Sequence, residues 1–396
     1  MTQQPTPDSA RPPLHVFSVP KKLSEMSYAE KVAWISQLHK QMVAQLTESD
    51  SQAETQSEIQ TESHTEIKRS TLKPLALIYS DVYLDWMLGS GNGDHPTNPV
   101  RAKLATELLV RNLGDNARVI DPVASGFEDR DLEALNNTHE SSYVRQTLSG
   151  TNHEWSGCKV QVANAGFAMF RGTIRAVEEL LAGRSRVAFN PQGAKHHARF
   201  ASGSGFCVFN DMAYAAKALQ AAGLRPLYID WDIHAGDGVM HMLEGSNIPC
   251  ISIHASDIYP MDHTMQTLGP RGEAHNADAH QYNFNVQRGD GDEQFKQYID
   301  AAAEIIDRYK PDVILVAAGA DGHTGVGNLG AIANYTKDGF RYAAEMVAEK
   351  AIAYSQGRVL IGGAGGYQPL VETPQTWALV VETIYNSVET ELTKGR

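Results

Sequence analysis

Short apolar runs rich in β-branched residues alternate with helical stretches over most of this 396-residue chain. The predicted strands are residues 75–79, 187–190, 227–231, 248–253, 313–317 and 359–361. The predicted helices are residues 172–181, 211–222, 293–309 and 336–355. Strands that alternate with helices form a parallel sheet covered on both faces, and strands buried on both faces are apolar throughout. The pattern therefore predicts an α/β fold with a mostly parallel sheet.

The first 70 residues differ in character from the rest of the chain. Residues 1–20 are rich in proline, and residues 27–46 place their apolar side chains near one helical face. The stretch that follows is rich in Ser, Thr, Gln and Glu, with too few apolar residues to offset the entropy of ordering. We predict an N-terminal extension, residues 1–70, with a helix at 27–46 and a flexible polar linker. A catalytic domain, residues 71–396, follows it.

Charge and composition exclude several classes of protein. The net charge of −13 opposes tight binding to nucleic acid, which needs clustered cations. No apolar run approaches the ~20 residues of a transmembrane helix, and the N-terminus lacks the pattern of a secretory signal. The three cysteines are far apart and suit a reducing compartment. We expect a cytoplasmic protein without a nucleic-acid or membrane partner, in which the helix at 27–46 could mediate homo-oligomer formation.

The strongest local signal is the segment 227–238, where a buried strand runs into four polar residues. Asp230, Asp232 and His234 alternate along an extended segment and so face the same side, and Asp237 follows. A carboxylate and an imidazole two residues apart can bind one metal ion, and mixed N and O ligands suit zinc or ferrous iron. The alternative is that Asp232 and His234 only hydrogen-bond each other at the strand end.

Another apolar strand, residues 313–317, places Asp321 just beyond its C-terminal end. A ligand from this position would complete an Asp–His–Asp set and leave a coordination position open for water and substrate, as a catalytic metal site requires. Taken alone, an aspartate here is equally well explained as a helix N-cap or turn residue.

Two further motifs carry groups suited to catalysis. The pair His196 and His197 would supply a general base and acid beside a metal, because imidazole titrates near neutral pH. The glycine-rich run 361–367 ends in Tyr367, whose hydroxyl could donate to a developing oxyanion. The alternatives are a structural histidine pair and a plain turn with a core tyrosine. No phosphate-binding helix opens after the run, which argues against a dinucleotide site.

These motifs together resemble the histone deacetylase superfamily, including bacterial acetoin-utilisation-type deacetylases and acetylpolyamine amidohydrolases. The resemblance runs from about Leu75 to Tyr385, and it rests on the following motifs: residues 95–101, His196–His197, residues 205–207, Asn210–Asp211, the Asp-x-Asp-x-His segment, Asp321 and Tyr367. It implies a three-layer arginase/deacetylase-type fold whose central sheet has about eight strands. It also implies an amidohydrolase that removes acetyl or other acyl groups from an amine nitrogen.

The resemblance assigns roles residue by residue. Asp232, His234 and Asp321 would bind one zinc ion, with ferrous iron as the other metal to consider. Oxygen atoms near the zinc would hold a structural potassium ion, from Asp230, Asp232, His234, Ser252 and Ile253. His196 and His197 would exchange the proton, with Asp230 and Asp237 as their carboxylate partners. Tyr367 would stabilise the oxyanion.

The substrate-binding positions are also carried over from the family. Gly205 and Phe206 resemble one wall of a narrow tunnel, and Tyr259 is a candidate for the other wall. Arg101 resembles an arginine that lines the route by which acetate leaves. The family commonly has a Gly-Asp-Pro run after the aspartate ligand, whereas this chain reads Thr-Gly-Val-Gly-Asn over residues 324–328. We expect Asn328, near the tunnel floor, to alter substrate preference, and the polar segment 262–280 to reshape the rim.

Several functions remain open at this point. Acetyl-lysine of proteins is the favoured substrate, and acetylated polyamines or other small acyl-amines are the alternatives. An arginase-like enzyme with two metal ions is disfavoured because Gly236 stands where a further ligand is needed, although His323 could partly compensate. A non-catalytic acyl-lysine-binding protein is disfavoured because the tyrosine, the histidine pair and all three ligands are present.

Overall fold

The computed structural model describes residues 72–88, 97–124, 129–152, 159–261, 274–276, 280–325 and 332–394. The predicted helix at 27–46, the polar linker, Asn328 and most of the segment 262–280 lie outside the described residues. The division between an extension and a catalytic domain near residue 70 therefore stays a prediction. Within the described residues, no helix is both long and apolar enough to cross a membrane.

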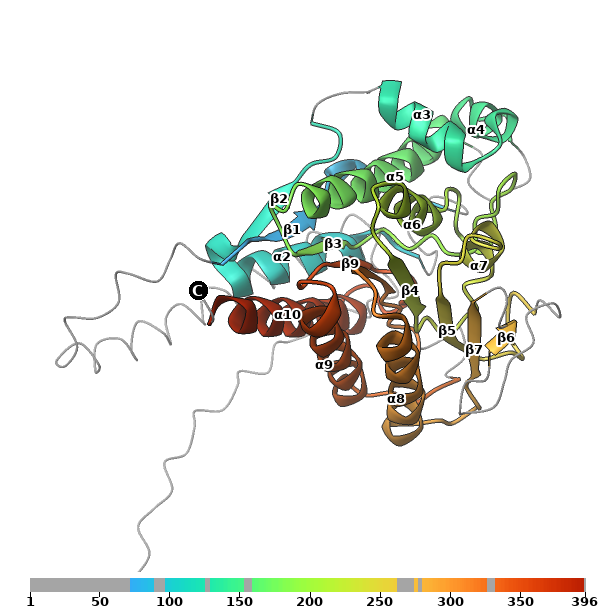
Figure 1. Cartoon of the computed structure of the whole chain (residues 1–396). Coiled ribbons are helices and arrows are strands. Elements are labelled where there is room, and N and C mark those ends of the chain that lie inside the picture. Colours follow the sequence, from blue (N-terminus) through green and yellow to red (C-terminus); the bar gives the residue numbers. More distant parts are fainter. Residues whose placement is uncertain are drawn as a thin grey trace, which may run out of the picture. The chain divides into compact units, whose positions relative to one another are not determined.

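One sheet runs through the described part of the chain (Figure 1). Its order is β2-β1-β3-β9-β8-β4-β5-β7-β6. The strands span Leu75–Ile78 (β1), Ala117–Ile120 (β2), Val187–Asn190 (β3), Pro226–Asp230 (β4), Cys250–His254 (β5), Ala274–Asn276 (β6), Gln281–Asn285 (β7), Val313–Ala317 (β8) and Val359–Gly362 (β9). Every neighbouring pair is parallel except β6 and β7. The predicted α/β fold with a mostly parallel sheet is confirmed.

Helices cover both faces of this sheet (Figure 1). The helices are Val100–Leu113 (α2), Asp129–Thr138 (α3), Ser141–Leu148 (α4), Val160–Leu181 (α5), Asp211–Ala221 (α6), Asp237–Met242 (α7), Asp292–Tyr309 (α8), Lys337–Tyr354 (α9) and Glu372–Thr393 (α10). Short 3-10 helices span Asp81–Asp85 (η2) and Gly114–Asn116 (η3). Helices α2, α8, α9 and α10 pack with one another on one face, and α5, α6 and α7 lie on the other. The result is a three-layer arrangement.

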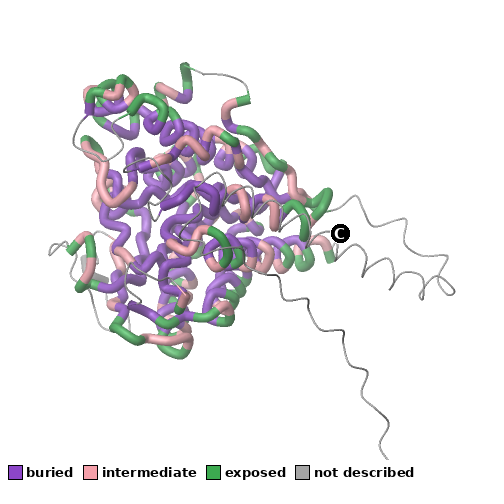
Figure 2. Tube along the Cα trace, turned by 180° about the vertical axis from the view of Figure 1, so that it is seen from behind, coloured by how far each residue is buried: buried purple, intermediate pink, exposed green. Residues whose placement is uncertain are grey.

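Side chains of successive strand residues enter opposite halves of the core. In β1, Leu75 and Leu77 join the cluster beneath α2 and α8–α10, whereas Ala76 and Ile78 join the cluster beneath α5–α7. Each fully buried leucine or isoleucine contributes roughly 1.5–3 kcal/mol by leaving water. Figure 2 shows buried residues along the interior of both layers and exposed residues on their outer turns. Burial on both faces is why the strands lack polar alternation.

Helix α5 corrects a prediction, because it begins at Val160 and not at Gly172. Gly172 lies in the middle of the helix, where it allows close approach to β1, β3 and the Tyr83 hydroxyl of η2. A Cβ atom at this position would lie 2.8 Å from the Nδ2 atom of Asn190 and 3.1 Å from the Cγ2 atom of Ile78. The glycine therefore marks a tight packing contact within the helix and not its start. Strand β5 also begins later than predicted, at Cys250, because Pro249 has no N–H to donate.

The strand order places four chain segments at one edge of the sheet. Strands β3, β9, β8 and β4 are neighbours, and their last residues are in register: Asn190 pairs with Gly362, Gly362 with Ala317, and Ala317 with Asp230. The loops that follow these strands therefore begin side by side. Ligands of open α/β sheets bind at this carboxyl edge, and all the predicted reactive segments lie there.

Candidate active site and metal centre

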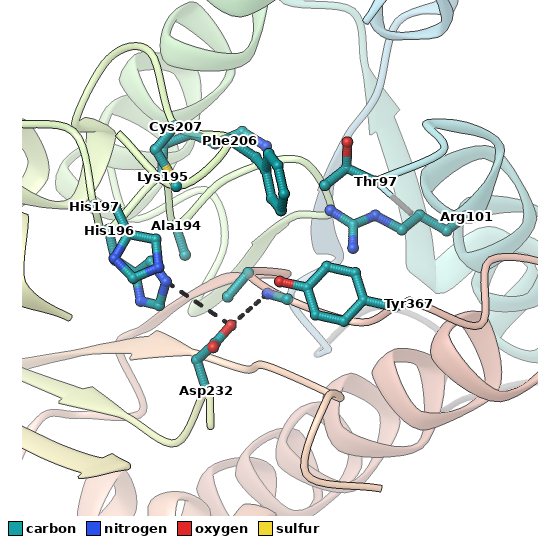
Figure 3. Close-up of a pocket in the computed structure, with 13 residues that line it drawn as sticks. Thr97, Arg101, Ala194, Lys195, His196, His197, Phe206, Cys207, Asp232 and Tyr367 are labelled. Atoms are coloured by element: carbon teal, nitrogen blue, oxygen red, sulfur yellow. Dashed lines mark hydrogen bonds and ion pairs between the residues drawn. The ribbon is translucent and has the colours of Figure 1, made fainter. Parts of the chain in front are cut away.

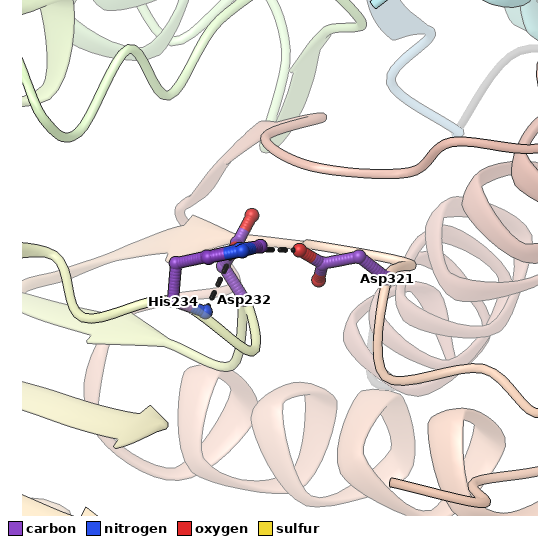
Figure 4. Close-up of side chains that lie close together, drawn as sticks. All are labelled: Asp232, His234 and Asp321. Carbon is purple, nitrogen blue, oxygen red and sulfur yellow. Dashed lines mark hydrogen bonds and ion pairs between the residues drawn. The ribbon is translucent and has the colours of Figure 1, made fainter. Parts of the chain in front are cut away.

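Asp232, His234 and Asp321 converge beyond the ends of β4 and β8 (Figure 4). The Nδ1 atom of His234 lies 3.0 Å from Oδ1 of Asp232 and 2.9 Å from Oδ2 of Asp321. The candidate ligand atoms all lie within 4.8 Å of one another. Among the described residues, no other group of three His, Cys, Asp or Glu side chains is arranged to hold a metal ion.

Backbone N–H groups hold the two carboxylates in place. Ile233 donates to Oδ1 of Asp321 at 3.0 Å, and Gly365 donates to Oδ2 of Asp232 at 2.6 Å. A Cβ atom on Gly365 would lie 2.9 Å from the Cγ atom of Asp321, which leaves no room for a side chain. The glycine-rich segment after β9 thus contacts the ligand set through its backbone. This is the close approach that the run of glycines predicted.

Two buried carboxylates beside each other need a compensating cation. Burial and the charge of Asp232 raise the pKa of Asp321 to about 6. Burial alone would lower the pKa of His234, but its hydrogen bonds to Asp232 and Asp321 outweigh burial and raise it to about 10. A divalent ion would supply the positive charge and leave the imidazole neutral. One nitrogen and two carboxylate ligands with open positions fit a catalytic zinc or ferrous ion.

The histidine pair lies beside this centre, and each ring is held by its own carboxylate. His196 Nδ1 is 2.8 Å from Oδ2 of Asp230, and His197 Nδ1 is 2.7 Å from Oδ1 of Asp237. The two ring centroids are 4.0 Å apart, and the centroid of His197 is 6.2 Å from that of His234. Because each Nδ1 atom is engaged, Nε2 is the atom left for proton transfer; on His196 it faces Oδ2 of Asp232 at 3.9 Å.

Their surroundings give the two histidines opposite proton affinities. Burial would lower the pKa of His196, but the charges of Asp230 and Asp232 outweigh it and raise the pKa to about 9. Burial, together with the charge of His196, lowers the pKa of His197 to about 4. At neutral pH the pair therefore holds one cationic ring, His196, and one neutral ring able to accept a proton, His197.

Tyr367 lies across the pocket from the histidine pair (Figure 3). Its ring centroid is 6.1 Å from that of His234. Burial, followed by the charges of Asp321 and Asp232, raises the pKa of the phenol well above its usual value. The hydroxyl therefore keeps its proton and acts as a hydrogen-bond donor. The pocket is lined by Thr97, Arg101, Ala194, Lys195, His196, His197, Gly205, Phe206, Cys207, Asp232, Ala364, Gly365 and Tyr367.

One wall of this pocket has a constrained backbone. Gly205 has φ = +49°, and Phe206, which follows it, has φ = +62° although it carries a side chain. A Cβ atom on Gly205 would lie 2.7 Å from the Cε1 atom of Tyr259. Tyr259 is 44% exposed, and its ring centroid lies 5.0 Å from that of His197. Gly205 and Phe206 thus line the pocket, whereas Tyr259 is not among the lining residues and packs against Gly205 and His197.

The other predicted residues have different surroundings. Arg101 is 2% exposed and donates from Nη1 to the Gly366 carbonyl at 2.6 Å. Ser252 and Ile253 lie within β5, where the hydroxyl of Ser252 pairs with Nδ1 of His254 at 2.8 Å. Ser252 also accepts from the Gly236 N–H at 3.4 Å, close to Asp230. Potassium binding at this position stays a prediction.

A second metal position of the arginase type, the disfavoured alternative, is not formed by the described residues. A Cβ atom on Gly236 would lie 2.5 Å from Oδ2 of Asp230, so even an alanine side chain is not accommodated there. His323 does not join the ligand set, because its Nδ1 accepts from the Gly325 N–H at 3.0 Å and its Nε2 faces Glu372 at 3.8 Å. This geometry disfavours an arginase-like pair of metal ions.

Three contributors were not identified from the sequence. Arg199 donates to Oδ2 of Asp237 at 2.7 Å, and the Tyr228 hydroxyl donates to Oδ2 of Asp230 at 2.6 Å. Arg199 thus binds the oxygen of Asp237 that His197 leaves unused. Tyr228 shares Oδ2 of Asp230 with His196. Lys195 lines the pocket directly before the histidine pair. The position of Lys195 beside His196 was the one available signal, and neither Arg199 nor Tyr228 had a pattern of its own.

Comparisons with known proteins agree with this geometry. A family model described as the histone deacetylase domain matches residues 95–384. The acetoin utilization protein AcuC of Bacillus subtilis is 27% identical over 331 residues, which cover 78% of this chain and 81% of AcuC. Histone deacetylase 8 of Xenopus tropicalis is 29% identical over 218 residues, 54% of this chain and 55% of the relative.

A similar fold occurs among solved structures. The crystal structure of the HDA15 HD domain superposes with a TM-score of 0.66 at 20% sequence identity. The match covers 80% of this chain and 90% of that domain. At this identity the likeness concerns the fold, and it agrees with the three-layer arrangement described above.

Proposed function

The chain belongs to the histone deacetylase family, and on that premise we propose that it is a zinc-dependent enzyme that removes acetyl groups from lysine side chains of proteins. The observation that carries the proposal is one pocket in which Asp232, the histidine pair and Tyr367 face one another, with His234 and Asp321 behind Asp232. That arrangement supports the assignment of metal ligands, a proton acceptor and an oxyanion donor to one catalytic site.

Asp232, His234 and Asp321 would hold the zinc ion. When bound, zinc polarises the amide carbonyl and lowers the pKa of a coordinated water. We also propose a structural potassium ion close by, because Asp230 and Ser252 bring buried oxygen atoms to adjacent positions at the ends of β4 and β5.

The protein groups then divide the remaining work. His197, neutral at pH 7, accepts the proton of the attacking water through Nε2, while Asp237 and Arg199 hold its ring. The Tyr367 hydroxyl donates to the oxygen that becomes negative as the carbonyl carbon turns tetrahedral. The C–N bond then breaks, and the leaving amine takes up a proton from the pair. His196, cationic and held by Asp230, balances the charge.

The pocket lining and the net charge support an extended, basic acyl-amine as the substrate. Gly205 and Phe206 line the pocket at the positions that form a tunnel wall in the family, which supports an acyl-lysine side chain as substrate, and the net charge of −13 attracts basic proteins or polyamines. Acetylpolyamines and other small acyl-amines are therefore the second candidate. Parallel kcat/KM measurements on an acetyl-lysine peptide and on acetylated polyamines distinguish the two classes.

Replacing Tyr367 by phenylalanine tests the catalytic assignment. We expect kcat to fall by about 10²–10³-fold, the usual cost of removing one oxyanion donor, with a smaller change in KM. Steady-state hydrolysis of a fluorogenic acetyl-lysine peptide measures this. Tyr342→Phe, which removes a hydroxyl bonded to Asp300 on the helical surface, is the matched control and should retain wild-type rates. Unchanged turnover in Tyr367→Phe would contradict the oxyanion role of Tyr367. A wild-type protein without turnover on any acyl-lysine peptide would instead support a pocket that binds acyl-lysine without hydrolysing it.

A further inference from the structure

Two buried cationic side chains line the pocket, and no carboxylate pairs with either one. Arg101 is 2% exposed and Lys195 is 7% exposed. Within the described part of the chain, neither side chain forms a salt bridge. Figure 3 shows the Arg101 guanidinium beside Thr97, and Lys195 on the Cys207 side of the pocket, with Phe206 between them.

The contacts of these two cations leave hydrogen-bonding capacity unused. Arg101 donates from Nη1 to the Gly366 carbonyl at 2.6 Å and stacks 5.0 Å from the Trp377 ring centroid, but its buried Nε has no partner. Lys195 Nζ has one long contact, 3.4 Å to Oε1 of Gln192, and lies 5.2 Å from the Trp86 ring centroid. Each side chain is held in position and keeps N–H groups available.

The negative charge of Asp211 raises the pKa of Lys195, but neither Asp211 nor Asp232 forms a salt bridge with Lys195 or Arg101. Asp232 lines the pocket, but its oxygens belong to the ligand set. Asp211 lies behind Lys195, and it already accepts from the backbone N–H groups of Ala194 and Lys195 and from the Thr173 hydroxyl. A buried charge is costly unless it is paired. Burial, with the charge of Arg101, lowers the pKa of Lys195 to about 8, so the amine is still mostly protonated at neutral pH.

The backbone around Lys195 is constrained as well. Ala194 has φ = +59°, a left-handed conformation that costs energy for a residue with a side chain, and Ala364 on the opposite loop has φ = +55°. Both residues line the pocket. Strain of this kind persists where the surrounding structure demands a particular geometry, and here it accompanies the placement of Lys195.

We propose that Lys195 and Arg101 together bind a carboxylate at the inner end of the pocket, so that the enzyme accepts acyl groups that end in a carboxylate. Malonyl is a short acyl group of this kind. The substrate assignment rests on the proposed function. Water adds its hydroxyl to the acyl carbon, the C–N bond breaks, and the amine gains a proton, which releases malonate and the free lysine.

The carboxylate product of hydrolysis, such as acetate, could bind Lys195 and Arg101 in the same way as the carboxylate of a malonyl substrate. The two sources are distinguished by a matched substrate series on the full-length, zinc-loaded enzyme. The series is acetyl-lysine, malonyl-lysine and isovaleryl-lysine peptides, of which the last is the neutral isostere of malonyl. We expect wild-type kcat/KM to favour malonyl over isovaleryl. In Lys195→Met, this ratio should fall by about tenfold or more, since a charge-assisted contact is lost.

Lys217→Met is the control, because it removes the same charge from the exposed surface of α6 and should leave the ratio unchanged. A second readout is the rise in Tm on adding malonate or acetate, which should be clear in the wild type and diminished in Lys195→Met. Lys195→Met should fold, because it removes an unpaired buried charge and keeps the length of the side chain.

The outcomes separate the two proposals. A carboxylate-induced rise in Tm that depends on Lys195, without malonyl preference, supports the anion site and assigns it to the released product. The same rise without hydrolysis of any acyl-lysine would contradict the proposed function and leave the anion site standing. If acetyl-lysine is hydrolysed while both the malonyl ratio and the carboxylate-induced rise are the same in Lys195→Met as in the wild type, the carboxylate site is overturned.

Discussion

Replacing Asp321 by asparagine is expected to remove the bound metal and reduce amide hydrolysis to the background rate. The carboxylate of Asp321 is buried, accepts the Ile233 N–H and faces Nδ1 of His234. An amide of the same shape keeps the packing but removes one of the two negative charges that attract a divalent cation. The expected loss therefore arises from the metal site and not from unfolding.

Metal content per chain and kcat/KM on an acetyl-lysine peptide are the measurements for this variant, with circular dichroism as the check on folding. Asp300→Asn is the matched control, because Asp300 is an exposed carboxylate on α8 that bonds the Tyr342 hydroxyl. The control should retain full metal and rate. An Asp321→Asn enzyme that is folded, holds one metal ion per chain and turns over normally would refute the ligand assignment.

Replacing His197 by asparagine is expected to lower kcat by about 10²–10⁴-fold, the usual contribution of a general base. His197 is the member of the pair whose pKa burial and His196 hold low, at about 4, so it is the ring that accepts a proton at neutral pH. The metal ligands do not include this side chain, so metal content should stay at the wild-type value. That combination distinguishes loss of a base from loss of the metal.

His241→Asn provides the comparison, since His241 lies on α7 and does not line the pocket. We expect its rate to match the wild type. The assignment of the base would fail if His197→Asn kept its rate, or if His196→Asn lost far more activity than His197→Asn at equal metal content. In the latter case the proton acceptor is His196.

The site residues beyond strand ends were predictable because a parallel sheet brings those ends together. The apolar strand β4 ends at Asp230, and Asp321 follows the end of the apolar strand β8. The register of β4, β8 and β9 makes the loops after these strands adjacent. Local sequence therefore carries both the residue type and its place in the sheet. The same reasoning predicted that the glycine run before Tyr367 approaches a ligand set through its backbone.

Other features depend on contacts between residues distant in sequence, and local patterns do not encode them. Gly172 suggested a helix start, whereas packing against Asn190 explains it within α5. Strand β2 is short and partly exposed at the sheet edge, so its pattern is weak. Arg199 and Lys195 became functional candidates only when the fold placed one beside Asp237 and the other in the pocket.

The most direct test of the account is the metal content of the purified full-length protein, measured with hydrolysis of an acetyl-lysine peptide before and after chelation. We predict one zinc ion per chain, loss of hydrolysis when the zinc is removed, and recovery when it is restored. The account would be contradicted by two manganese ions per chain without amide hydrolysis, or by deacetylation that persists in the metal-free protein.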